Sequence, residues 1–119
     1  MKILIVDDEK DVQRLFEQRF RRERKKGQVE LFFAFSGREA VDFLEQGGEE
    51  LTMILSDINM PNMDGLELLE FVRSKFTKLK VFMITAYGDE SNKKRAIDLG
   101  ANDYLMKPIN FKHLKEKIF

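Results

Sequence analysis

The chain has 119 residues, the size of one domain with its own core, so we expect a single domain over residues 1–119. A composition that is 43% hydrophobic and 35% charged excludes a disordered or fibrous chain, and the absence of cysteine excludes disulfides and thiolate metal sites. The 21 basic residues balance the 21 acidic ones, which excludes the broad positive field of a free-standing nucleic-acid-binding protein.

Short apolar runs rich in β-forming residues alternate with segments whose apolar residues recur at helical spacing. This alternation predicts an α/β fold with a parallel sheet and crossover helices. We expect strands at 3–6, 29–35, 53–55, 81–84 and 104–106, and their nearly continuous apolar character predicts burial on both faces. Five helices should connect and follow the strands, and the basic run from Arg19 to Lys26 is interpreted as the solvated end of the first helix.

The apolar runs also limit where the protein can reside. The longest of them are far shorter than the roughly 20 residues needed to cross a bilayer. The sequence opens on Met-Lys and a buried type of strand, with no signal-peptide pattern. We therefore expect a cytoplasmic protein that does not contact a membrane.

Polar residues with chemical potential follow four of the expected strands. Asp7 and Asp8 follow the first strand, Asp57 the third, Thr85 the fourth and Lys107 the fifth. In an open α/β sheet, ligands bind in the crevice outside the carboxyl ends of the strands. These side chains, far apart in the sequence, are therefore expected to meet at one site.

Three carboxylates in one crevice indicate a metal site. Asp7, Asp8 and Asp57 would repel one another unless a cation were bound between them. Magnesium fits best, because it accepts one or two carboxylates and shares its other positions with water and phosphate oxygens. The alternative is that Asp7 and Asp8 cap the helix expected to begin near Glu9. Capping leaves the acid, the hydroxyl and the lysine at the other strand ends unexplained.

Thr85 and Lys107 supply the groups that phosphoryl transfer requires, a hydroxyl and an ammonium around the phosphate oxygens. A carboxylate among such donors can act as a nucleophile and form an aspartyl phosphate. Asp57 is the candidate, because it follows the expected central strand and precedes the turn MPNMDG.

Four segments together identify a resemblance to a known family. They are VDDE at 6–9, SDINMPNMDG at 56–65, ITAYG at 84–88 and GANDYLMKP at 100–108. In this order and at these spacings, the chain resembles the receiver domain of two-component response regulators over its whole length. The resemblance implies a chemotaxis-type receiver fold, which is a flavodoxin-like, doubly wound sheet of strand order 2-1-3-4-5 with helices on both faces.

The resemblance also implies roles for the site residues. Asp57 would be the phosphoacceptor, and Lys107 would pair with it. Asp8 and Asp57 would bind Mg2+ directly, the main-chain carbonyl of Asn59 would complete the protein ligands, and Asp7 would join through a water molecule.

The switch implied by the resemblance uses a hydroxyl and an aromatic ring. Phosphate on Asp57 would draw Thr85 inward, and Tyr104 would turn from exposed to buried. The surface formed by the fourth helix, the fifth strand and the fifth helix would then change shape. The peptide bond between Lys107 and Pro108 would be cis, which proline makes accessible at under about 1 kcal/mol.

The implied partners are a sensor histidine kinase as phosphohistidine donor, and an output domain or a downstream protein. A homodimer could form through the same switch surface. A stand-alone receiver that signals by protein binding is the second possibility. The third is an aspartate-nucleophile phosphohydrolase, but such enzymes usually carry a general acid two residues beyond the nucleophile, and Asn59 stands there. We therefore expect a switch that catalyses only its own phosphorylation and dephosphorylation.

Overall fold

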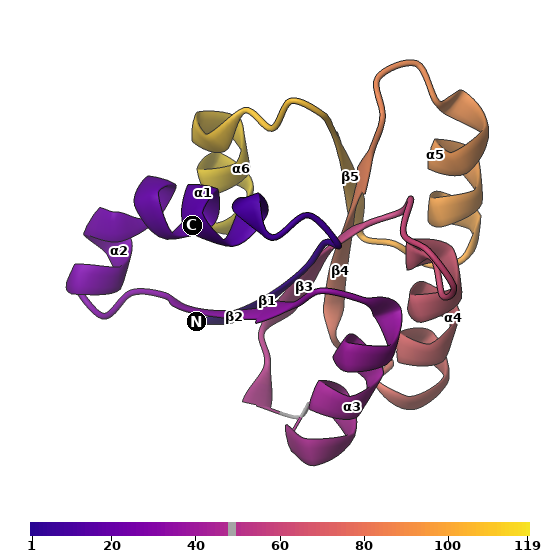
Figure 1. The fold of residues 1–119 in the computed structure, drawn as a ribbon, viewed down its shortest axis with the longest axis horizontal. Helices are drawn as coiled ribbons and strands as arrows, with labels where there is room; N and C mark the ends of the chain where they lie inside the picture. The colour runs from indigo at the N-terminus through magenta and orange to yellow at the C-terminus, as the bar shows by residue number, and fades with distance from the viewer. Residues whose placement is uncertain (48–49) are drawn as a thin grey trace.

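The computed structural model describes residues 1–47 and 50–119 and contains one five-stranded parallel sheet (Figure 1). The strands run in the order β2-β1-β3-β4-β5, which confirms the predicted doubly wound topology. Their bounds are β1 Lys2–Val6, β2 Glu30–Ala34, β3 Met53–Asp57, β4 Lys80–Thr85 and β5 Asp103–Met106.

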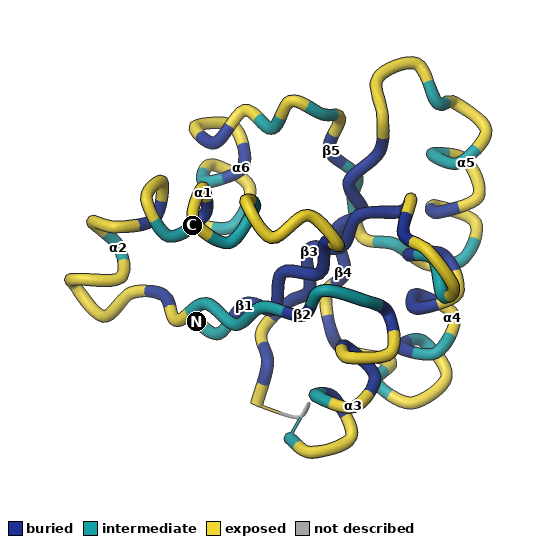
Figure 2. The backbone as a smooth tube through the Cα atoms, in the orientation of Figure 1, coloured by how far each residue is buried: buried dark blue, intermediate teal, exposed yellow. Residues whose placement is uncertain are grey.

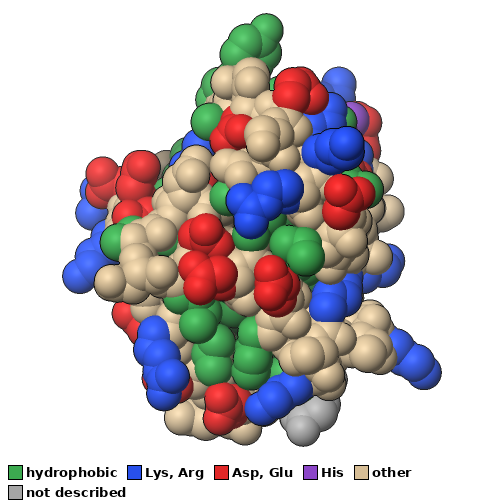
Figure 3. Space-filling model, turned by 90° about the vertical axis from the view of Figure 1, so that its right-hand side faces the viewer, with side chains coloured by type: hydrophobic (Ala, Val, Ile, Leu, Met, Phe, Trp, Pro, Cys, Tyr) green, Lys and Arg blue, Asp and Glu red, His purple; other side chains and the backbone are tan. Residues whose placement is uncertain are grey.

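Helices cover both faces of this sheet (Figure 1). One face carries α1 Asp11–Arg19, α2 Arg21–Lys25 and α6 Phe111–Ile118, and the other carries α3 Gly37–Gly47, α4 Gly65–Lys75 and α5 Glu90–Asp98. Over the surface at the α4–α5 end, acidic and basic side chains are intermixed (Figure 3). None of the helices in the described ranges has the length and apolar character to span a membrane.

Alternation along the central strands divides the core into two layers. In β1, Ile3 and Ile5 pack with α1 and α6, whereas Leu4 and Val6 pack with α3 and α4. All four side chains are at most 1% exposed, because β1 lies between two other strands and beneath helices on both faces. The continuous apolar run of this strand is therefore explained by its position in the interior of the sheet.

The second strand is less buried than its sequence predicts. Leu31, Phe32 and Phe33 are only partly buried (Figure 2), because β2 lies at one edge of the sheet. Phe32 packs against Phe43 of α3, with ring centroids 5.3 Å apart. The three residues still contact the two core layers, but one side of the strand stays open.

The first helix is shorter than expected, and the basic run does not simply continue it. α1 ends at Arg19, Phe20 adopts φ −103° and ψ 16°, and α2 begins at Arg21. Phe20 is fully buried and packs against Phe16 and Phe111, with ring centroids 6.0 and 6.2 Å away. The backbone thus turns at the residue that stays in the core, and a separate, largely exposed basic helix follows.

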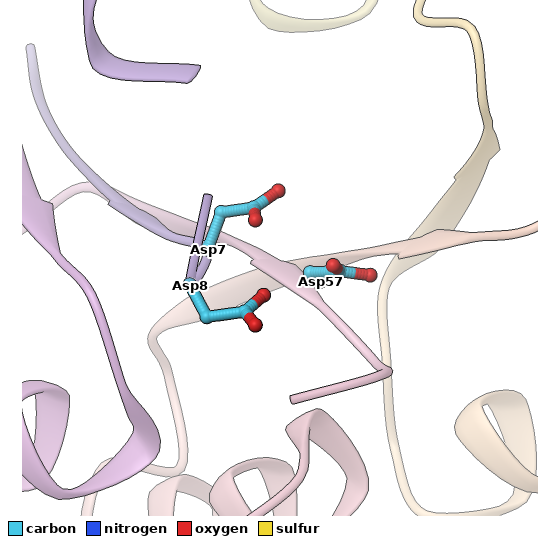
Figure 4. A group of neighbouring side chains, drawn as sticks. All are labelled: Asp7, Asp8 and Asp57. Carbon is cyan, nitrogen blue, oxygen red and sulfur yellow. The ribbon is translucent and has the colours of Figure 1, made fainter. Parts of the chain in front are cut away.

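The strand register sets the position of the functional site. Val6 pairs with Ser56, Asp57 with Ile84, and Thr85 with Met106. Because the strands are parallel, the residues that follow them emerge together at the carboxyl ends of the strands. Asp7 lies there after β1, and Asp57 lies there at the end of β3 (Figure 4).

Candidate functional site: an acidic cluster with a lysine

Three carboxylates meet beyond the ends of β1 and β3. Asp7, Asp8 and Asp57 each place a carboxylate oxygen within 4.8 Å of the others, and their side chains point into the same space (Figure 4). Asp7 is 3% exposed and Asp57 4%, whereas Asp8 is exposed. The cluster therefore has a buried wall and one solvent-facing acid, and could hold a cation that enters from solvent.

The acids do not serve as a helix cap. α1 begins at Asp11, and its N-cap Lys10 makes no side-chain capping hydrogen bond. Asp7 instead accepts a hydrogen bond of 2.9 Å from the backbone N–H of Glu9, which stabilises the turn after β1. The capping interpretation is wrong for this helix, and Asp7 keeps its second oxygen directed at the cluster.

Lys107 links the acids from the end of β5. Its Nζ lies 3.1 Å from Oδ2 of Asp57 and 3.7 Å from Oδ2 of Asp7. Its backbone N–H donates a 2.9 Å hydrogen bond to the carbonyl of Thr85, and the Lys107–Pro108 peptide bond is cis. The ammonium thus belongs to the same site as the carboxylates.

Burial and neighbouring charges together set the electrostatics of the cluster. Burial raises the pKa of Asp7, the hydrogen bond from the Glu9 backbone opposes the rise, and the nearby Asp57 carboxylate adds to it. Burial acts to lower the pKa of Lys107, but the hydrogen bond with Asp57 and the attraction of Asp57 and Asp7 outweigh it, so that this pKa is raised. One ammonium therefore stays charged beside an excess of carboxylates.

The donor set fits a hard divalent cation. All the candidate side-chain ligands are carboxylates, and oxygen is the ligand atom that Mg2+ prefers. Asn59, exposed and next in the loop, donates its backbone N–H to Oδ1 of Asp57 at 3.4 Å. Burial is the main cause of the raised pKa of Asp7, and a cation bound among the acids would reduce the further contribution that comes from repulsion by Asp57.

The roles of two residues at the start of α4, next to the strand that ends at Asp57, were missed in the sequence. Gly65 begins α4 and lies directly against β3, so that a Cβ there would stand 2.2 Å from the Asp57 carbonyl oxygen. Asp64 forms a capping box with Glu67. The signal was available, because an Asp followed three residues later by Glu before an apolar run predicts this cap.

Thr85 lies on the strand beside Asp57, and its side chain is almost completely buried. Its hydroxyl donates a long hydrogen bond of 3.5 Å to the carbonyl of Leu105. Tyr104 lies further back on β5, paired with Met83, and is not part of the acidic cluster. Its ring is partly buried beneath Lys93 of α5, whose Nζ lies 4.2 Å from the ring centroid. Sequence patterns did not indicate Lys93, because the contact joins two elements.

A doubly wound parallel sheet with three carboxylates and a lysine at the carboxyl ends of its strands defines a flavodoxin-like α/β protein with an acidic ligand crevice. The chain belongs to the response regulator receiver domain family, whose model matches residues 3–119. The resemblance in the sequence is thereby confirmed, and the protein is the receiver domain of a two-component response regulator.

Solved structures agree with this assignment. The chain is similar to a response regulator receiver domain protein from Clostridium thermocellum, with 25% identity, a TM-score of 0.88, and coverage of 98% of this chain and 90% of that chain. It is also similar to the Francisella response regulator 1452 receiver domain, with 28% identity, a TM-score of 0.81, and coverage of 98% and 92%.

A third similar structure contains a partner protein. It is the co-crystal structure of the Saccharomyces cerevisiae histidine phosphotransfer signalling protein Ypd1 and the receiver domain of its downstream response regulator Ssk1. The identity is 28%, the TM-score is 0.84, and the match covers 99% of this chain and 86% of that chain.

Proposed function

We propose that this receiver domain is a phosphorylation-controlled switch, in which Asp57 accepts a phosphoryl group from a phosphohistidine of a sensor histidine kinase. The single observation that carries the proposal is the position of the Lys107 ammonium, 3.1 Å from a carboxylate oxygen of Asp57 and beside two further acids. Such a cation can stabilise charge on the oxygens of a transferring phosphoryl group.

The transfer is a displacement at phosphorus. A carboxylate oxygen of Asp57 donates an electron pair and forms the new O–P bond. The P–N bond of phosphohistidine breaks, and its electron pair returns to the imidazole nitrogen. The product is an acyl phosphate on the receiver. We propose that the domain modifies only itself and does not turn over other substrates.

The acidic cluster supports Mg2+ as the cofactor of this step. We assign Asp8 and Asp57 as direct ligands, the main-chain carbonyl of Asn59 as a third, and Asp7 as a ligand through water. Bound Mg2+ would supply positive charge against the phosphoryl oxygens. Burial is the main cause of the raised pKa of Asp7, and the nearby Asp57 carboxylate adds to it; a cation at this position would offset both effects.

Thr85 and Tyr104 are the proposed switch residues. The Thr85 hydroxyl makes only a 3.5 Å hydrogen bond to Leu105, which a shorter, charge-assisted bond to a phosphoryl oxygen could replace. Movement of Thr85 would change the space available to Tyr104, and the populations of its exposed and buried states would shift.

The surface that would respond is formed by α5, β5 and α6. We propose that an output domain, a downstream protein or a second copy of the chain binds there. The similarity to the Ypd1–Ssk1 complex supports a phosphohistidine donor as the upstream partner. A single domain over residues 1–119, working in the cytoplasm without direct contact to nucleic acid, is part of the same proposal.

Mass spectrometry after treatment with acetyl phosphate and Mg2+ tests the acceptor. One phosphate per chain should map to Asp57 and be lost in Asp57→Asn, whereas Asp42→Asn, at an exposed acid of α3, should be modified as the parent is. Modification at another residue, or at none, would contradict the proposal. Multiple turnover of a small phosphomonoester would instead favour a phosphohydrolase.

The fluorescence of Tyr104, measured in a Tyr87→Phe background, tests the switch. Phosphorylation should change the emission, and Thr85→Ala should accept phosphate without this change. An equal change in both proteins would show that Thr85 does not connect the acceptor to the ring.

A further inference from the structure

A second candidate site lies at the α1–α2 end of the molecule, on the left in Figure 1. A cleft of about 660 Å³ opens there between α1, α2 and the start of β2. Four basic side chains line it, and all four residues are exposed: Arg14, Arg21, Arg24 and Lys25. No residue of the acidic cluster lines this cleft. The phosphorylation proposed for Asp57 therefore does not account for the cleft.

The charge of this region differs sharply from that of the rest of the chain. Residues 10–26 contain eight Lys or Arg and three Asp or Glu, a net charge of +5. The whole chain is neutral, so the remaining residues carry −5. Residues 10–26 therefore carry an excess of positive charge, which can attract an anionic group.

The free edge of the sheet forms another wall of the cleft. Glu30 donates its N–H to the carbonyl of Met1, and Ala34 accepts from the N–H of Asp7, so both residues point toward β1. Successive residues of a strand alternate in direction, and the backbone groups of Leu31 and Phe33 therefore point to the open edge. The sequence ELFFA of β2 contains neither lysine nor proline, the residues that commonly block an edge strand.

We propose that this edge binds an acidic peptide segment of a partner protein, in extended conformation, as a sixth strand beside β2. The backbone groups of Leu31 and Phe33 would pair with the main chain of the peptide. Its acidic side chains on the α1–α2 face would pair with the guanidinium groups of Arg14, Arg21 and Arg24. The site is independent of the phosphorylation proposed for Asp57.

The chemistry of the cleft favours a peptide over a nucleic acid. Glu17 and Glu30 line the same cleft, and a continuous phosphate chain would meet both carboxylates. Arg24 lies 3.9 Å from Glu17 in a solvent-exposed pair, which a better-placed carboxylate can replace at little cost. An edge strand also offers alternating donors and acceptors that match a peptide backbone, and a nucleic acid has no equivalent pattern.

Fluorescence anisotropy with a labelled seven-residue peptide of alternating Glu and Val tests the proposal at low ionic strength. The peptide should bind and shift the backbone amide resonances of Leu31 and Phe33. Charge reversal in the cleft, Arg21→Glu with Arg24→Glu, should weaken binding at least about tenfold. The matched control is Lys94→Glu with Lys112→Glu, at exposed lysines that do not line the cleft, and it should retain the affinity of the parent.

Modified peptides separate backbone pairing from simple attraction of charge. Two versions of the peptide are N-methylated at alternate residues, one at the Glu residues and the other at the Val residues. Only one of these two sets of N–H groups faces β2, so one version should lose binding and the other should keep it. The corresponding Lys–Val peptide should not bind. Absence of binding by the Glu–Val peptide, equal binding of both N-methylated versions, or tighter binding of an oligouridylate at the same residues would overturn the proposal.

Discussion

Replacement of Gly65 by alanine should destabilise the protein strongly, because its Cβ would enter the backbone of the strand that carries Asp57. The added atom would stand 2.2 Å from the Asp57 carbonyl oxygen and 2.8 Å from Cα of Ile58. Ordinary van der Waals contact begins near 3.4 Å, so the start of α4 must move outward by about 1.2 Å. Neither neighbour can rotate away, since both atoms belong to the backbone.

That movement would disturb two further interactions. Gly65 donates its N–H to the Ile58 carbonyl at 2.8 Å, and Asp64 and Glu67 form the capping box at the same helix end. Overpacking costs about 1–3 kcal/mol and a lost cap about 1 kcal/mol. We therefore expect Gly65→Ala to lower the free energy of unfolding by about 2–4 kcal/mol.

Urea denaturation followed by circular dichroism measures this loss as a lower midpoint at an unchanged slope. Gly47→Ala is the matched control, because a Cβ at Gly47, in the last position of α3, meets nothing within 4 Å. That variant should be as stable as the parent or more stable by up to about 1 kcal/mol. If Gly65→Ala stays within about 0.5 kcal/mol of the parent, the reasoning from close contact is wrong.

Three other predictions follow from the acidic cluster and from α4. Burial raises the pKa of Asp7 in the folded state, so the free energy of unfolding should fall as the pH rises from the ordinary aspartate range through this raised pKa. In urea titrations with EDTA, Asp7→Asn should reduce that fall. An unchanged pH profile in the variant would contradict the assignment. Free Mg2+ at about 100 times its Kd should raise the free energy of unfolding by about 2.7 kcal/mol, and Asp8→Asn should reduce the resulting shift in Tm; no shift with Mg2+ would count against the metal site. Arg73 donates hydrogen bonds to the carbonyls of Gly100 and Leu79 and to the side chain of Asn102, at 2.8, 2.6 and 2.6 Å. Arg73→Lys keeps the charge but not this planar set of donors, and should lower the free energy of unfolding, measured by chemical denaturation, by about 2 kcal/mol. A loss below about 0.5 kcal/mol would show that the three bonds do not act together.

Much of the fold followed from local patterns. The five strands were predicted within a few residues of their observed bounds, because each is an apolar run flanked by turn residues or polar residues. Their order came from the resemblance to the receiver family and is confirmed by the sheet. Asp57 and Lys107 are 50 residues apart in the sequence. They come close together because parallel strands have their carboxyl ends on the same side of the sheet.

Other features depended on contacts between elements and were missed or wrong. Phe20 fitted the apolar stripe of the first helix, but its packing against Phe111 of α6 accompanies a turn that separates α2 from α1. The apolar residues of β2 suggested burial on both faces, yet the strand lies at the edge of the sheet. The contact of Lys93 with Tyr104 joins α5 to β5 and leaves no periodic signal in either segment.

The amino-acid sequence by itself determined which chemical groups follow which strands, since residue type and spacing are properties of the chain. Tertiary structure decided how deeply Asp7 and Asp57 are buried, how close Lys107 comes to them, and that Gly65 must leave room for the Asp57 carbonyl. The physical reason is that hydrophobic periodicity acts over a few residues, whereas burial, electrostatic crowding and steric fit depend on neighbours that the folded sheet and its helices bring from distant parts of the chain.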